Sequence, residues 1–316
     1  MTATTIFEDN HVSVYFSPAA EGKRSDVAVL SYSPMNHDFA ARGIPALAAL
    51  RSHGFDVFGI IARQNNWYPK TSLTQAAEAL GNFLQGYSRK VGYGSSMGGY
   101  AAIKYSALMG CDCVLSLAPQ VSIDPSDVPW DGRFAKYFSP NLHQDMNISS
   151  DDVAGTIYVV ADPMLAVDLR HFCEVETLQS GQAFLVPAYF CDHYVVNPIA
   201  SRTILAAMFS AVLDSDIEKV RGVYRKARKE SSYYRGALMH ALALRRMKQG
   251  HLDAALAACE VAVESMPMFA EFLLTKSKIH MVRKEREAAI TAARQAVDLD
   301  PMREWYRRVL SEAEAS

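Results

Sequence analysis

The chain has 316 residues, of which 50% are apolar and 21% charged, and its formal net charge at pH 7 is −2. This apolar content excludes a disordered protein, and the length suits one large domain or two ordinary ones. A charge so close to zero argues against nucleic acid or a membrane surface as the partner. The charge is uneven, because residues 1–215 carry 13 basic and 20 acidic residues, whereas residues 216–316 carry 19 and 14. Two parts of opposite sign indicate two domains.

The first part of the chain alternates short apolar runs with helical patterns. Strands are predicted at residues 5–7, 12–16, 27–33, 55–61, 90–94, 113–118, 156–161 and 183–190, and helices at 38–54, 72–87, 97–110 and 165–181. From the third strand on, most runs are continuously apolar, as in a mostly parallel sheet covered by helices on both faces. Each helix is long enough for a right-handed crossover, and the first two strands form a hairpin at one edge. We therefore expect a doubly wound α/β domain over residues 1–215.

The segment at residues 119–150 interrupts this alternation. It is rich in Pro, Asp, Ser and Asn and has little periodicity. A loop of this length is uncommon unless it has a task such as covering a site. We consider two interpretations, a lid or insertion over a functional site and an ordered surface excursion without a catalytic role. Arg133 lies in this segment and could bind an anionic group or simply be solvated.

Beyond residue 215 the pattern becomes entirely helical, and the sequence repeats itself. "GHLDAALAACEVAVESMPMFAEF" aligns with "KEREAAITAARQAVDLDPMREWY" at a shift of 34 residues. The matching pairs are Pro267 and Pro301, Ala255 and Ala289, Ala258 and Ala292, Ala262 and Ala296, and Val263 and Val297. This pattern resembles the tetratricopeptide repeat over about 232–316, and the resemblance implies helix pairs that present a concave face to a protein partner. The alternative is a plain helical bundle whose period is accidental.

Cysteine usage and the apolar runs bear on the compartment of the chain. The five cysteines are scattered, and Cys111 and Cys113 have no second ligand pair nearby, so neither disulfides nor zinc is expected. The opening "MTATTIFEDNHV" lacks the basic and apolar regions of a signal peptide. The longest apolar run, "ILAAMFSAVL", is too short to span a bilayer. We expect a cytoplasmic protein that needs no metal or organic cofactor.

A glycine-flanked serine stands between a predicted strand and a predicted helix in "KVGYGSSMGGYAAIKY". The pattern G-x-S-x-G fits with Ser96 at its centre, flanked by Gly94 and Gly98, and fails with Ser95 at its centre. In a nucleophile elbow the serine occupies a strained turn, and side chains two residues away on either side would collide. Its hydroxyl then lies at the carboxyl edge of the sheet, beside a helix N-terminus that favours a developing anion.

On these residues the first part of the chain resembles the α/β-hydrolases, and "GSSMGGYAA" is similar to the elbow of esterases in that superfamily. The resemblance implies a nucleophile, an acid and a histidine in that chain order. Asp162, which ends the strand at 156–161, and His193, which follows the last strand, satisfy it after Ser96. Asp168 is a second candidate for the acid, although its place in a helix would point it elsewhere. His171 is interpreted as a helix residue and Asp192 as a solvated loop residue.

The same resemblance implies two backbone N–H donors for an oxyanion. One belongs to Met97, directly after the nucleophile, and the other to Ser33 or Tyr32, after the third strand. The usual His-Gly pair is absent there, because the sequence reads Ser31-Tyr32. The loop "RQNNWYP" after the fourth strand contains four candidate substrate-binding residues, Arg63, Asn66, Trp67 and Tyr68. They would suit a sugar or another hydroxylated or anionic substrate, while Trp67 could instead pack inward.

Two functions remain in view. The first is a serine hydrolase acting on an ester or acyl substrate, or an acyltransferase by the same acyl-enzyme route. The polar and aromatic loop gives the chain a resemblance to hydrolase-like acyltransferases and accessory proteins of bacterial glycan assembly, which implies a small-molecule or glycan-linked substrate. The second is a non-catalytic protein in which the hydrolase fold is a scaffold and the repeats bind a partner.

Overall fold

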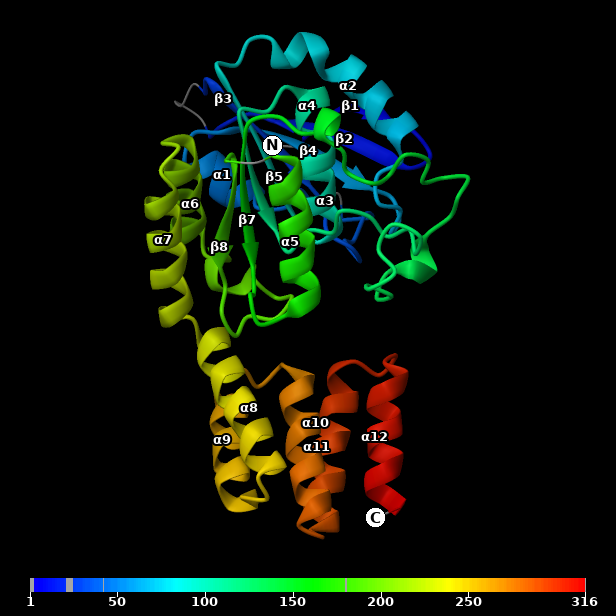
Figure 1. Cartoon of the computed structure of the whole chain (residues 1–316), viewed down its shortest axis with the longest axis vertical. Helices are drawn as coiled ribbons and strands as arrows, with labels where there is room; N and C mark the ends of the chain where they lie inside the picture. Colours follow the sequence, from blue (N-terminus) through cyan, green and yellow to red (C-terminus); the bar gives the residue numbers. More distant parts are fainter. Residues whose placement is uncertain (1–2, 21–24, 42, 180, 316) are drawn as a thin grey trace. The chain divides into compact units, whose positions relative to one another are not determined.

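The computed structural model describes residues 3–20, 25–41, 43–179 and 181–315. The chain folds as two compact units, residues 1–227 and residues 228–316. The first unit is built around a sheet, and the described part of the second consists of helices (Figure 1). The division lies within helix α7 (Ile217–Glu230), so the first unit extends beyond the boundary expected at residue 215.

The first unit contains an eight-stranded sheet of order β1-β2-β4-β3-β5-β6-β7-β8. Its strands are β1 (Thr4–Glu8), β2 (Val12–Ser17), β3 (Val27–Tyr32), β4 (Asp56–Ala62), β5 (Arg89–Ser95), β6 (Cys113–Leu117), β7 (Thr156–Ala161) and β8 (Ala183–Pro187). The hairpin β1–β2 and the pair β2–β4 are antiparallel, and all the other neighbours are parallel. The mostly parallel α/β sheet predicted from the apolar runs is therefore confirmed.

Helices cover both faces of this sheet (Figure 1). They are α1 (Leu47–Ser52), α2 (Lys70–Leu84), α3 (Met97–Lys104), α4 (Ser106–Met109), α5 (Ala166–Leu178) and α6 (Arg202–Leu213). Helices α2, α3 and α5 share one apolar core with alternate residues of the strands, such as Leu30, Phe58 and Val159. Phe209 of α6 packs against Tyr93, which follows the opposite alternation of β5. Successive side chains of a strand point to opposite faces of the sheet, so each strand contributes alternate residues to the packing on either face.

Two predicted elements differ from the observed ones. The helix expected over residues 38–54 forms only at Leu47–Ser52, because Pro45 restricts the backbone before it, and residue 42 lies outside the described residues. The last strand ends at Pro187 rather than at residue 190, since Phe190 has a φ of 61°, which no strand residue adopts. This early end begins the loop that carries His193.

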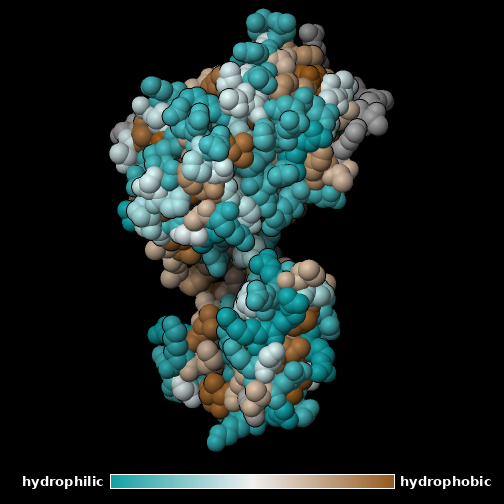
Figure 2. All heavy atoms as spheres, turned by 90° about the vertical axis from the view of Figure 1, so that its right-hand side faces the viewer, coloured by the Kyte–Doolittle hydropathy of each residue, from teal (hydrophilic) through white to brown (hydrophobic). Residues whose placement is uncertain are grey.

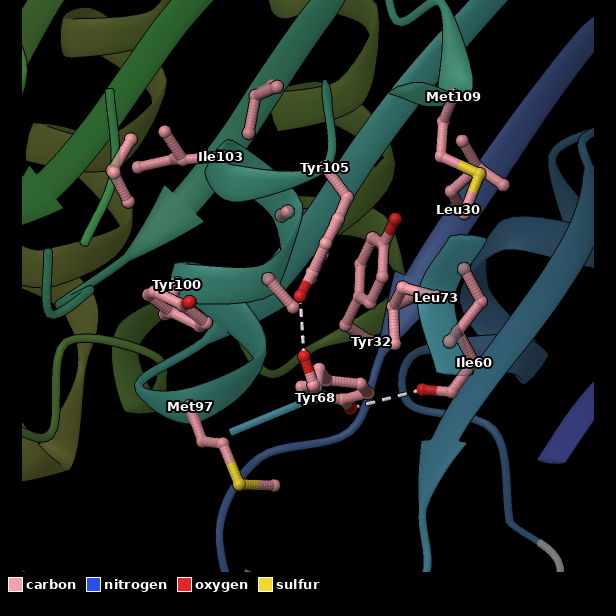
Figure 3. Packing of buried hydrophobic residues seen from close by; sticks show 14 of the residues in the cluster. Leu30, Tyr32, Ile60, Tyr68, Leu73, Met97, Tyr100, Ile103, Tyr105 and Met109 are labelled. Atoms are coloured by element: carbon pink, nitrogen blue, oxygen red, sulfur yellow. Dashed lines mark hydrogen bonds between the residues drawn. The ribbon is translucent and has the colours of Figure 1, made fainter. Parts of the chain in front are cut away.

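The core beneath the nucleophile turn is rich in tyrosine (Figure 3). The Tyr68 hydroxyl donates to the Ile60 carbonyl oxygen at 3.1 Å, and the Tyr105 hydroxyl donates to the Tyr68 carbonyl oxygen. Tyr32 packs edge-on against Tyr68, with ring centroids 5.6 Å apart. These hydroxyls contact backbone carbonyl oxygens of β4 and of the loop that follows it, and they hold the carboxyl edge of β3 and β4 against α3.

The segment at residues 119–150 is irregular apart from the short 3₁₀ turn Ala135–Tyr137 and the start of a second one, Ser150–Asp152. The Lys104 ammonium of α3, only 3% exposed, donates to the Asn147 carbonyl oxygen and to the Asp152 carboxylate, both at 2.7 Å. His143 contacts the Asn66 carbonyl oxygen at 2.9 Å. Buried polar contacts of this kind fasten the segment to α3 and to the loop after β4.

The second unit contains α8 (Ser232–Lys248), α9 (Leu252–Ser265), α10 (Ala270–Val282), α11 (Arg286–Leu299) and α12 (Glu304–Ala315). The alanines that match at a shift of 34 residues are all buried, namely Ala255, Ala258, Ala262, Ala289, Ala292 and Ala296. Pro267 and Pro301 lie in the turns before α10 and α12. Small side chains at these positions let the paired helices approach closely.

Helix α7 supplies a test of where the first unit ends. Val220 and Tyr224 are fully buried, and the Tyr224 hydroxyl donates to the Val195 carbonyl oxygen at 2.8 Å. We expect a chain ending at residue 230 to unfold at nearly the temperature of the first unit in the full chain. A chain ending at residue 215 exposes the surface that α7 covers and loses roughly 3–5 kcal/mol of stability. Thermal unfolding of both chains measures the difference, and equal midpoints would contradict the role of α7.

Hydrophilic residues predominate on the face seen in Figure 2, and the hydrophobic ones form scattered groups rather than a continuous band. In the part of the chain that the structure describes, none of the helices combines the length and the apolar character that a membrane crossing requires.

Candidate active site

Ser96 lies in a sharp turn between β5 and α3, with φ 53° and ψ −117°. Non-glycine residues rarely adopt a positive φ, so the backbone of this turn is strained. A Cβ atom on Gly94 would lie 2.2 Å from the Gly98 carbonyl oxygen, and one on Gly98 would lie 2.6 Å from the Tyr32 carbonyl oxygen. The two glycines predicted from the G-x-S-x-G spacing are thus required by backbone contacts on both sides of the serine.

A hydrogen-bonded chain runs from this serine to a carboxylate. Ser96 Oγ lies 3.0 Å from Nε2 of His193, and Nδ1 of the same ring lies 2.7 Å from Oδ2 of Asp168. An ionised carboxylate can only accept, so Nδ1 carries the proton and Nε2 is left to accept from the serine hydroxyl. The side chain of Asp168 is fully buried, whereas the side chain of His193 is 25% exposed. The arrangement can draw a proton from Ser96.

Asp162, the acid predicted from its place at the end of β7, does not contact His193 in this way. Its Oδ1 accepts the Met164 N–H at 2.9 Å, and its Oδ2 accepts the Asp192 N–H at 2.8 Å. Burial raises the pKa of Asp162, and the backbone N–H groups of Met164 and Asp192 oppose that rise. Asp162 therefore ties the loop after β7 to the loop that carries His193, and the structure places Asp168 at the imidazole instead.

Asp168 reaches His193 because of its place in α5. The helix starts at Ala166, so Asp168 lies in its first turn, at the carboxyl edge of the sheet. The buried residues of α5 are Asp168, His171, Phe172 and Val175, which recur at helical spacing on one face. The expectation that helical geometry would turn Asp168 away is therefore wrong. An acidic residue at the start of a buried stripe is the signal by which the sequence could have identified it.

The carboxylate of Asp168 has a second partner in the segment at residues 119–150. Its Oδ1 accepts from the Arg133 guanidinium at 2.7 Å. Burial alone would raise the pKa of Asp168, but the hydrogen bond and charge of His193 and the charge of Arg133 outweigh it and lower the pKa. Arg133 is thus neither a solvated cation nor a lone anion site. Nothing in its sequence context marked it as a partner of a distant helix.

The expected oxyanion donors differ in their environment. Met97 is the first residue of α3, so its N–H is one of those that have no partner within the helix. The Ser33 N–H, in contrast, already donates to the Ile60 carbonyl oxygen at 3.2 Å. Tyr32 lies inside β3, in register with Ile60 of β4 and Gly94 of β5. Ser33 and Tyr32 are therefore part of the sheet and its edge, which contradicts their assignment as the second donor.

The four residues predicted as a substrate-binding wall have structural contacts. Arg63 pairs with Glu8 at 2.9 Å and donates to the Asp9 carbonyl oxygen, so it fastens the hairpin β1–β2. The exposed fractions of Asn66, Trp67 and Tyr68 are 4%, 1% and 0%, too small to present a surface to a substrate. The structure thus contradicts the wall, and with it the reason for expecting a sugar or an anionic group.

One residue beside the serine has no counterpart in the sequence-based prediction. Gln120, fully buried after β6, directs Nε2 toward Ser96 Oγ at 3.5 Å and donates to the Ala118 carbonyl oxygen at 3.2 Å. Its Oε1 accepts from Nε1 of Trp67 at 3.3 Å, which fixes the orientation of the amide. Trp67 also packs against Phe134 and so joins the segment at residues 119–150 to the serine. A glutamine in an irregular loop carries no pattern that reveals this position.

The strand order, with its antiparallel hairpin at one edge, and the serine turn between β5 and α3 define the first unit as an α/β-hydrolase fold. No family model and no curated protein matches the chain.

Similar solved structures bear names from serine esterase and acyl-transfer chemistry. Est1E from Butyrivibrio proteoclasticus is 12% identical, with a TM-score of 0.49 over 69% of this chain and 98% of its own. FphF, a fluorophosphonate-binding serine hydrolase of Staphylococcus aureus, is 13% identical, with a TM-score of 0.41 over 58% of this chain and 88% of its own. A capsule O-acetyltransferase of Neisseria meningitidis serogroup A is 12% identical, with a TM-score of 0.40 over 57% of this chain and 85% of its own.

Proposed function

We propose that the first unit is a serine hydrolase that acts on an ester or acyl substrate through Ser96, His193 and Asp168. The observation that carries the proposal is the continuous hydrogen-bonded chain from Ser96 Oγ through both ring nitrogens of His193 to Asp168. It coincides with a strained serine backbone at the start of a helix. A nucleophile, a base and a group that orients the base are the three parts that acyl-enzyme chemistry requires.

The roles follow from the geometry. Ser96 Oγ attacks the acyl carbon while Nε2 of His193 takes up its proton, and Asp168 keeps Nδ1 protonated and stabilises the imidazolium that forms. The Met97 N–H faces the developing oxyanion at the start of α3. For the second donor, Ser33 is occupied and Pro34 has no N–H, so the next N–H along the chain is that of Met35. His193 then returns the proton to the leaving group.

The acyl-serine can pass to water or to an alcohol, and the same residues serve both outcomes. Hydrolysis gives a free acid, whereas transfer gives a new ester. Adding an alcohol or a sugar to a reaction with p-nitrophenyl acetate separates them, because an acceptor increases the release of p-nitrophenol only where deacylation limits the rate. The ester product identifies transfer directly.

The nucleophile is tested with a fluorophosphonate probe, whose P–F bond is replaced by a bond to the serine oxygen. We expect the protein to be labelled at Ser96 and the Ser96→Ala variant to remain unlabelled, because His193 contacts the Ser96 hydroxyl and can activate it. The matched control is Ser95→Ala, which removes the neighbouring hydroxyl at the end of β5 and should label normally. Absence of labelling in the unsubstituted protein, or labelling of the Ser96→Ala variant, would refute the proposal.

We also propose that the second unit consists of tetratricopeptide-type repeats that bind a protein partner. The support is the period of 34 residues, at which the matched alanines are buried in helices α9 and α11. The chain ending at residue 230 tests the division of labour. It should keep the labelling of Ser96 and lose association with any partner that the full chain binds.

A further inference from the structure

The segment at residues 119–150 brings a compact ion-pair network to the proposed acid. Arg133 donates through Nε to Oδ1 of Asp131 and through a terminal nitrogen to Oδ2, both at 2.8 Å. The same terminal nitrogen reaches Oδ1 of Asp168 at 2.7 Å. The guanidinium therefore bridges two carboxylates whose side chains are 2% and 0% exposed. A planar fork of fixed donors suits this bridge, which a point charge could not reproduce.

Asp131 is itself held from two sides. His171 accepts the Val121 N–H on Nδ1 at 3.2 Å, so its proton is on Nε2, which donates to Oδ2 of Asp131 at 3.0 Å. Burial lowers the pKa of His171, which keeps the ring neutral, and the contact with Asp131 opposes that effect. Burial would raise the pKa of Asp131, but hydrogen bonds from His171 and Arg133 outweigh it and hold the pKa far below its usual range. Asp131 is therefore an anion that fixes Arg133.

Other charged groups reach His193 from the neighbouring elements. Asp192, the preceding residue, accepts the His193 N–H at 2.8 Å, and Asp162 at the end of β7 accepts the Asp192 N–H. Asp168 in α5 contacts the ring itself. These three carboxylates place negative charge around the imidazole. Arg133 brings a positive charge to one of them, Asp168.

We propose that Arg133 is a positioning residue for Asp168: it holds Oδ1 so that Oδ2 faces His193, and its charge offsets that of the carboxylate beside the ring. The proposal rests on the proposed function, because Arg133 positions the carboxylate that orients His193 in the proposed triad. Asp131 acts on the same balance with the opposite sign, since its negative charge offsets part of the guanidinium charge. The segment at residues 119–150 thus takes part in setting the working range of the enzyme.

The test is the pH dependence of the second-order rate constant for fluorophosphonate labelling of the full chain. In Arg133→Gln the charge of Asp168 is no longer offset, the imidazolium persists to higher pH, and the acidic limb should move up by about one pH unit. In Asp131→Asn the guanidinium acts on Asp168 with its full charge, and the acidic limb should move down. Arg133→Lys keeps the charge and loses the fork, so its limb should stay near that of the unsubstituted protein while the plateau falls.

Opposite shifts from the two halves of one ion pair cannot arise from general loss of packing. The control is Arg225→Gln, which removes an exposed positive charge from the same unit and should leave the profile unchanged. A fall of the plateau in Arg133→Gln without movement of the limb would overturn the proposal, as would shifts of the same sign in both variants. Where Arg133→Gln does not fold, the direction of the shift in Asp131→Asn decides. Failure of the unsubstituted protein to label would instead refute the triad.

Discussion

Replacing Asp168 with asparagine is expected to lower the rate of Ser96 acylation by about 10⁴-fold, the loss that follows when the group orienting a catalytic histidine becomes an amide. The carboxylate oxygen that accepts from Nδ1 of His193 lies at 2.7 Å. An asparagine can present its NH₂ group there, which favours the tautomer with the proton on Nε2. In that tautomer Nε2 no longer accepts the proton of Ser96. Fluorophosphonate labelling and the initial release of p-nitrophenol from p-nitrophenyl acetate both measure the loss.

The matched control is Asp162→Asn, which changes the other buried aspartate between β7 and β8. Asp162 contacts the backbone of Met164 and Asp192 rather than the imidazole. Its loss should therefore act through small displacements of the loop and lower the rate by about 100-fold or less. If the Asp162 variant lost as much activity as the Asp168 variant, or more, the assignment of the acid would return to Asp162. Circular dichroism of both variants separates this result from unfolding.

The fold could be predicted because its signals are local and repeated. Buried parallel strands are continuously apolar, and Gly94 and Gly98 must be glycine because of contacts with a few neighbouring backbone atoms. The chain order of nucleophile, acid and histidine limited the candidate acids to the connection between β7 and β8. This order could not decide between Asp162 and Asp168, because the choice depends on where α5 begins. The buried stripe that contains His171, Phe172 and Val175 was the better guide, since Asp168 lies on it.

The residues that surround the triad could not be predicted from the sequence, for a different reason. Trp67 and Tyr68 have φ values of 44° and 55°, a conformation that non-glycine residues seldom adopt, let alone in succession. This backbone turns both side chains inward, so a loop that looks like a polar and aromatic wall becomes core. Gln120 and Arg133 come from an irregular segment, where neither period nor spacing indicates which distant residue a side chain will meet.

The last prediction concerns the stability of the serine turn. In Gly94→Ala the new methyl group would lie 2.2 Å from the Gly98 carbonyl oxygen and 2.9 Å from the Gly99 nitrogen, both of which are backbone atoms. No side-chain rotation can relieve such contacts, so β5 and α3 must move apart. We expect a loss of about 3 kcal/mol or more in the free energy of unfolding, and loss of labelling because Ser96 leaves its alignment with His193.

The matched control is Gly81→Ala, in the interior of α2, where the added Cβ meets no atom within 4 Å. Alanine is the better helix former by about 1 kcal/mol, so this variant should be stabilised and label normally. Urea unfolding followed by tryptophan fluorescence compares them, since Trp67 lies buried beside Gln120 in the first unit. Equal stability of the two variants would mean that the turn can relax, and that the glycine pair does not enforce the strained backbone of Ser96. Opposite signs at two glycines of one unit would tie the strain to the position of the nucleophile.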